Sequence, residues 1–289
     1  IPTIKTLMQL QNLEWSNGVP NTVVEITDQD NVDIADIATK SSVPVVSSSD
    51  FVSKTVVQCS RYLGYSAVYA ELFSFGNNNI VLHSVKGYEN KYFGEVAQAF
   101  KNSILLGVSW VEEKNGVERR TAVLNPEPDY ELFDDEELII LTSQEGPEIS
   151  SLPTTEIEPL MDVAPYERPV FNRVLILGWN ASIIDILREF DGHAVQEVTV
   201  TIVSSHSEEF VERIFSGNMA KGLNQVKVTY KNSDTANRGV LKSLDIPSYD
   251  DVIVLADESN PAYDPDSRTS LTLPVSYTHL RAHETSRNL

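Results

Sequence analysis

Apolar positions along the chain alternate between short unbroken runs and helical spacing, and the clearest example begins at residue 174. Residues 174–177 are a continuous apolar run typical of a buried strand. Apolar residues at 183, 186, 187 and 190 then follow on one helical face. The alternation continues to residue 256, which predicts a parallel sheet covered by helices. The expected strands are 173–177, 198–203, 226–230 and 252–256, and the expected helices are 181–190, 208–215 and 235–243.

A shorter version of the same alternation fills the first 64 residues. Residues 23–27 and 43–46 read as strands, and a helix is expected at 31–38. Ser47 and Asp50 supply N-cap chemistry for a second helix that runs through Cys59. Because this pattern starts in mid-unit and the first residue is Ile1, we expect the chain to be part of a longer protein.

The remaining segments differ in character. Residues 65–145 carry short β-like runs around an amphipathic segment at 93–100, which predicts a small α+β module. Residues 146–170 contain five prolines and little periodicity, as in a linker. The predicted organisation is therefore two Rossmann-like α/β units, 1–64 and 171–273, with the module and linker between them. Residues 274–289 lack either period, resemble translated sequencing-adapter DNA, and are excluded as a non-native tail.

The turn after the strand at 173–177 resembles a dinucleotide-binding loop that has lost its glycines. That fingerprint reads G-x-G-x-x-G, so that the backbone can approach a pyrophosphate. Here only Gly178 remains, while Asn180 and Ile183 occupy the second and third glycine positions. Side chains there obstruct a diphosphate. We therefore expect neither NAD nor another nucleotide as a cofactor, and expect Trp179 to fill the empty pocket or to pack as a plug.

Composition excludes several classes of partner. The formal net charge of −20 argues against nucleic-acid binding and against an anionic membrane surface. Cys59 is the only cysteine, so no disulfide can form within the chain. His83, His193 and His206 belong to no motif that joins a histidine to a nucleophile. We therefore predict a protein that is not an enzyme and has no catalytic residues.

Ligand sites are predicted where ligands of open α/β sheets bind, at the carboxyl ends of the strands. Gly178, Trp179 and Asn180 follow one strand, and Asp257 and Glu258 follow another. Hard oxygens of the kind that calcium prefers occur in two places. One is the loop that carries Asp264 and Asp266, and the other is the acidic turn of Asp134, Asp135, Glu136 and Glu137. The alternatives are a helix N-terminal cap formed by Asp266 and a solvated turn.

Several short blocks of the sequence, taken in their order along the chain, resemble a known protein family, which composition alone does not show. In the first half of the chain the blocks are residues 23–31, 58–64 and 124–126. In the second half they are Gly178-Trp-Asn with residues 187–191, then residues 232–244, residues 251–259 and the helix start at Asp266-Ser-Arg268. In this order and spacing they resemble the Castor/Pollux/SYM8 ion-channel family across the chain up to Leu273. The resemblance implies tandem regulator-of-conductance (RCK) domains, relatives of the TrkA nucleotide-binding fold.

The family resemblance also implies a function and partners. It implies a cytosolic gating module of a cation (potassium) channel, assembled as a homotetrameric ring beneath its own transmembrane pore. Two alternatives stay open. One is a soluble TrkA-like nucleotide-sensing subunit of a potassium transporter, and the other is an NAD-dependent oxidoreductase, which the degenerate glycine loop disfavours.

Overall fold

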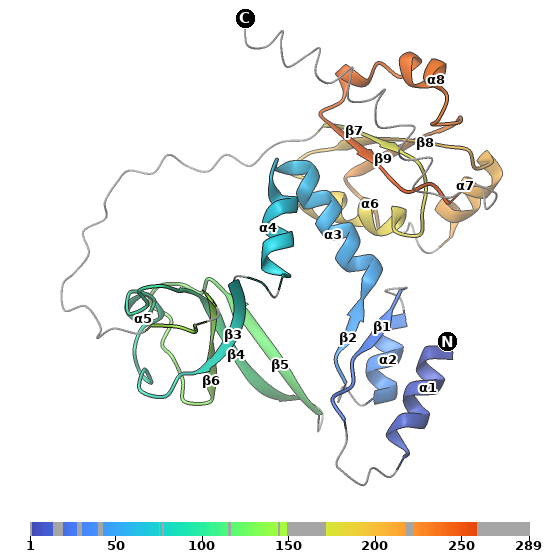
Figure 1. Ribbon diagram of the computed structural model, residues 1–289. Helices are drawn as coiled ribbons and strands as arrows, with labels where there is room; N and C mark the ends of the chain where they lie inside the picture. The colour runs from blue at the N-terminus through green and yellow to red at the C-terminus, as the bar shows by residue number, and fades with distance from the viewer. Residues whose placement is uncertain are drawn as a thin grey trace, which may run out of the picture. The chain divides into compact units, whose positions relative to one another are not determined.

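The computed structural model describes residues 2–13, 20–27, 31–39, 43–74, 76, 78–114, 117–143, 145–148, 172–217 and 222–258 (Figure 1). The chain divides into two compact units. One consists of residues 1–46 with 64–165, and the other of residues 47–63 with 166–289. Among the helices that the structure describes, none combines the length and apolar character needed to cross a membrane.

The second unit is built on a four-stranded parallel sheet of strand order β10-β7-β8-β9. The strands are β7 (Arg173–Leu177), β8 (Val198–Ser204), β9 (Val226–Asn232) and β10 (Asp251–Val254). Helices α6 (Ile183–His193), α7 (Glu208–Ser216) and α8 (Arg238–Ser243) connect them, with the short 3-10 helix η3 (Ile246–Ser248) before β10. The predicted parallel α/β sheet is confirmed.

Both faces of this sheet are covered, which explains its unbroken apolar runs. Side chains alternate between the two faces of a strand. Val174 and Ile176 of β7 therefore join the core under α6 and α7. Leu175 and Leu177 join the core under α8 and η3 on the other face.

Helix α3 (Ser48–Arg61) packs on this second unit. Ser47 is its N-cap, and the side chain of Ser47 accepts a hydrogen bond from the Asp50 N–H at 3.4 Å. Val57 is fully buried in the core that α6 contributes to, and α3 runs beside α6 in Figure 1. The sequence grouped this helix with residues 1–64, because periodicity shows an apolar face but not which element covers it.

The small module is an antiparallel sheet of strand order β3-β6-β4-β5. Its strands are β3 (Asn78–Ser84), β4 (Ile104–Lys114), β5 (Val117–Leu124) and β6 (Glu136–Ser143), with α5 (Phe93–Ala97) over one face. A Cβ at Gly107 would lie 2.0 Å from the Val123 carbonyl oxygen, so β4 and β5 can approach this closely only with glycine there. The expected α+β module is present.

The remaining described elements belong to the same unit as this module. Strands β1 (Val24–Ile26) and β2 (Val45–Ser47) form a two-stranded sheet, with α1 (Pro2–Gln11) and α2 (Val32–Thr39) beside them. Helix α4 (Tyr65–Leu72) contacts β3. Helices α1 and α4 and strand β5 were not predicted from the sequence. Helix α1 was missed although Ile4, Leu7 and Met8 have helical spacing, whereas the apolar residues of α4 and β5 follow neither period clearly.

Candidate functional site

Gly178 ends β7 in a conformation that only glycine adopts readily. Its φ is +100°, and a Cβ there would lie 2.6 Å from the Leu255 carbonyl oxygen and 3.4 Å from Asp257 Cβ. The Gly178 N–H donates to the Val203 carbonyl at 2.8 Å. The chain after β10 therefore approaches this turn closely. Packing between strands alone accounts for the one glycine that the loop has kept.

Trp179 occupies the carboxyl edge of the sheet as part of an aromatic cluster. Its side chain is only 6% exposed. The centroid of its ring lies 5.6 Å from that of His206, 6.0 Å from that of Phe210, and 6.3 Å from those of Phe215 and Tyr230. All four contacts are edge-to-face, the favourable geometry for aromatic pairs. The arrangement agrees with Trp179 as a packed plug.

The other two former glycine positions are also used for folding. Ile183 is 2% exposed and lies in the core under α6. The Asn180 side chain accepts a hydrogen bond from the Ser182 N–H at 3.0 Å and so shapes the first turn before the helix. Both side chains therefore have structural roles at the former glycine positions.

The ends of β8 and β9 meet this cluster through a hydroxyl network. Tyr230 Oη lies 2.9 Å from Ser204 Oγ and donates toward the Ser204 and His206 carbonyl oxygens, at 3.1 and 2.7 Å. Burial raises the pKa of Tyr230. Because the tyrosine stays protonated at neutral pH, it remains a donor to backbone carbonyls and holds the β8–α7 turn in place.

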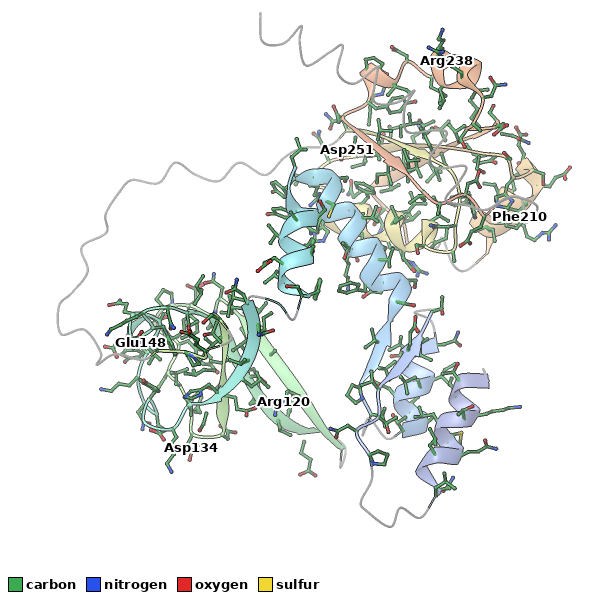
Figure 2. The ribbon with its side chains drawn as sticks, in the orientation of Figure 1. Arg120, Asp134, Glu148, Phe210, Arg238 and Asp251 are labelled. Atoms are coloured by element: carbon green, nitrogen blue, oxygen red, sulfur yellow. The ribbon has the colours of Figure 1, made fainter. Side chains whose placement is uncertain are left out.

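His206 is the titratable group of the cluster. Its ring stacks on Phe210 with centroids 4.2 Å apart and planes 17° apart, and Figure 2 labels Phe210 on α7. Burial lowers the pKa of His206, while the charge of Asp257 acts in the opposite direction. The imidazole is therefore neutral at pH 7 and packs as an aromatic ring.

The structure brings the five predicted ligand residues to one edge. Asp257 is 2% exposed and adjoins Gly178, and the Glu258 N–H donates to the Trp179 carbonyl at 2.9 Å. The sequence analysis missed His206, Phe210, Phe215 and Tyr230 as members of this site. The signal available was His206 just after the second strand and Tyr230 near the end of the third.

The acidic turn before β6 divides into separate roles. Glu136 is 5% exposed, and its carboxylate accepts from the Tyr130 hydroxyl and, at 3.0 Å, from the Phe133 N–H. Glu137 pairs instead with Arg120. Asp134 and Asp135 are exposed at the turn, where Figure 2 labels Asp134. Glu136 is thus directed into the module rather than towards its two aspartate neighbours.

Burial, with the neighbouring Glu136, raises the pKa of Tyr130 to about 12. Tyr130 therefore remains a hydrogen-bond donor to Glu136 at any ordinary pH. Within the described ranges no group of three or more His, Cys, Asp or Glu side chains is arranged to hold a metal ion. Asp264 and Asp266 lie outside the described residues. Calcium at either place stays a prediction.

The sequence of the chain is similar to those of known ion channels. Residues 49–158 match the family model of Castor and Pollux, described as part of a voltage-gated ion channel. The chain is 23% identical to the probable ion channel POLLUX of Oryza sativa subsp. japonica over 257 residues, and 23% identical to the ion channel CASTOR of Lotus japonicus over 256. Each match covers 87% of this chain, but only 26% and 29% of those relatives.

Among solved structures, the human SLO3 gating ring superposes with a TM-score of 0.59 at 13% identity. The match covers 86% of this chain and 52% of that one. At this identity the similarity establishes the fold alone, which is that of RCK gating-ring domains. The sequence matches confirm the resemblance of the ordered blocks, and the chain is similar to the Castor/Pollux/SYM8 ion channels over most of its length.

Proposed function

We propose that this chain is a cytosolic regulatory module of a cation channel, selective for potassium, and that it carries out no covalent chemistry. Its relatives are named as ion channels, and its fold is that of a channel gating ring. The observation that carries the proposal is the aromatic cluster around Trp179, which fills the edge where a Rossmann enzyme would hold its dinucleotide.

In the proposed mechanism, copies of the chain assemble as a tetrameric ring beneath a pore formed by another part of the same protein. A ligand that binds the open form of the ring more tightly than the closed form shifts the population toward open. A ligand with equal affinity for both forms shifts nothing. The formal charge of −20 on each chain favours the accumulation of cations near the ring.

The first test is the complete coding sequence that contains this chain. The proposal expects at least two apolar stretches of about 20 residues ahead of it, since that length crosses a bilayer. Expression of that sequence should then give potassium currents that a deletion of residues 172–258 alters. A complete coding sequence without such stretches would overturn the proposal and favour a TrkA-like subunit that docks on a separate membrane protein.

Assembly is tested on the chain itself by native mass spectrometry. The chain mass is 32.2 kDa, so a tetrameric species would appear at four times that mass. Observation of monomers alone across the micromolar range would contradict assembly through this part of the protein.

Calcium is proposed as the regulatory ligand, with Asp134 and Asp135 or Asp264 and Asp266 as the oxygen donors. Calorimetric titration should detect binding that the Asp134→Asn/Asp135→Asn or the Asp264→Asn/Asp266→Asn double variant abolishes. Glu208→Gln/Glu209→Gln, two exposed changes on α7, is the matched control for the loss of two charges. Unchanged binding in both double variants would exclude these residues as the calcium site.

A further inference from the structure

Helix α3 holds a special position in the chain. It follows β2 and precedes α4, which both belong to the other compact unit, yet it packs on α6 and β10. Val57 is fully buried in this contact, and Val56 packs partly buried beside it. Packing within the second unit therefore holds α3 against the sheet.

A buried carboxyl lies where α3 meets the sheet. Asp251 is the first residue of β10 and only 9% exposed, and Figure 2 labels it at the end of the sheet near α3. Its Oδ2 lies 3.3 Å from Ser60 Oγ. The same Ser60 Oγ lies 3.0 Å from the Val57 carbonyl oxygen within α3.

The number of hydrogens that Ser60 and Asp251 can donate favours the protonated form of Asp251. A serine hydroxyl has one hydrogen to donate but can also accept. With Asp251 ionised, Ser60 must choose between the carboxylate and the Val57 carbonyl. With Asp251 protonated, the acid donates to Ser60 Oγ, and Ser60 donates to Val57 over the shorter 3.0 Å distance. Both contacts are satisfied only in the protonated form.

The charges around Asp251 oppose one another. Burial raises its pKa to about 6, with help from Asp250, while donation by the Ser60 hydroxyl to the ionised carboxylate and the charge of the Arg61 guanidinium act to lower it. Asp250 is itself fixed, since its carboxylate accepts from the Asn172 and Arg173 N–H groups at 2.9 Å each.

Ion pairs on the packed helices hold other charged groups. Lys54 and Asp50 pair on α3 at 2.8 Å, and Arg188 and Asp185 pair on α6 at 3.0 Å. The residue opposite Asp251 on β7 is the apolar Val174. Arg61 is the cation whose charge acts to lower the pKa of Asp251, and it belongs to α3 and would leave with it.

We propose that the docking of α3 on the second α/β unit is coupled to a proton on Asp251, so that the helix is held most tightly in mildly acidic solution. Undocking exposes Asp251 to water, where its pKa returns toward 3.8. Below that value both states carry the proton, and docking is at its strongest. As pH rises toward about 6 the undocked state loses its proton first, so docking weakens, and it levels off above that pH.

The difference between the two pKa values sets the limit of the effect. A shift from 3.8 to about 6 corresponds to a change of up to about a hundredfold in the docking equilibrium. The inference concerns the folded chain itself, and it stands whether or not the chain regulates a channel.

Amide hydrogen exchange of the full chain between pH 4 and pH 8 tests the coupling. Protection factors, taken relative to intrinsic rates, are compared for α3 and for β8 at the centre of the sheet, which reports global unfolding. We expect α3 protection to fall by up to about a hundredfold between pH 4 and 6 and then to level off. Global unfolding also exposes Asp251, so β8 protection carries the same dependence on pH. Protection of α3 should instead be lower than that of β8 at every pH, because undocking costs less free energy than unfolding.

Three variants make the test specific. Asp251→Asn keeps a donor for Ser60 without a titratable proton, so α3 protection should stay high and flat across this range. Arg61→Gln removes a cation that lowers only the docked pKa of Asp251, so the fall should begin at the same pH but become larger and level off at a higher pH. Glu209→Gln should reproduce the wild-type profile.

Three outcomes would overturn the proposal. One is a flat profile for wild-type α3, and another is a fall that persists unchanged in Asp251→Asn. The third is α3 protection equal to that of β8 at every pH, which would show that α3 exchanges through global unfolding and not through undocking.

Discussion

The two ends of β10 each carry a buried aspartate, but the surroundings of the two residues differ. Asp257 follows the carboxyl end and lies beside Gly178 and the aromatic cluster of Trp179, His206, Phe210, Phe215 and Tyr230. Asp251 begins the strand and faces the Ser60 hydroxyl of α3. The carboxyl edge is packed with rings, whereas the opposite end holds a carboxyl against a helix that enters from elsewhere in the chain.

The contrast reverses the usual expectation for a doubly wound sheet. In such folds the carboxyl edge binds the ligand and the opposite edge serves stability. Here side chains fill the carboxyl edge, and the opposite end contains the group whose protonation depends on packing. The identity of an acidic residue therefore says less about its role than the groups that surround it.

Truncation of the tryptophan should give the largest effect on stability. Trp179→Ala removes the ring that four aromatic side chains contact, so we expect the free energy of unfolding to fall by about 3–5 kcal/mol. Chemical denaturation, monitored by circular dichroism, measures this free energy of unfolding. Phe133→Ala, at a side chain that is 54% exposed, should cost less than about 1 kcal/mol. Similar losses in the two variants would contradict the packed edge.

A methyl group at Gly178 should have the next largest effect. Gly178→Ala must adopt a φ of +100° and place a Cβ against the Leu255 carbonyl, so a loss of about 2–3 kcal/mol is expected. Gly192→Ala on α6 is the matched control, because a Cβ there meets nothing within 4 Å. That variant should be neutral or more stable by about 0.5–1 kcal/mol. Equal changes in stability in the two alanine variants would show that the close approach of the Leu255 carbonyl does not restrict residue 178 to glycine.

His206 should give the smallest effect, opposite in sign to that of Asp251. Its pKa is lowered by burial, so the stability it contributes is present above its unfolded pKa of 6.5 and is lost as pH falls below that value. Because the ring is partly exposed, we expect less than about 1 kcal/mol. His206→Gln should reduce the difference in stability between pH 7.5 and 5.5, and His83→Gln on β3 should not. A larger loss at acidic pH in His206→Gln than in the wild type would contradict this sign.

Strand and helix periodicity accounted for most of the second unit, because both faces of its sheet are covered and its apolar runs are long. The same reasoning identified Gly178, Asn180 and Ile183 as the altered loop positions. It could not find α4, whose eight residues include no buried side chain and therefore no clear apolar face.

The partners of the site residues depend on contacts between distant parts of the chain. Ser60 and Asp251 are 191 residues apart, and no local pattern signals their contact. Glu136 likewise reads as part of an acidic cluster until its bonds to Tyr130 and Phe133 show that it is directed into the module. Sequence patterns place such residues on an element, and only packing shows which of them face solvent.

Side chains pack the carboxyl edge of the β10-β7-β8-β9 sheet, and we expect this edge to bind no nucleotide cofactor. Calorimetric titration of the chain with NADH and with ATP measures such binding. We expect no saturable heat up to about 1 mM of either nucleotide, which corresponds to a binding free energy less favourable than about −4 kcal/mol. Saturable binding of one nucleotide per chain, weakened by a substitution at Asn180 or Asp257, would contradict this expectation.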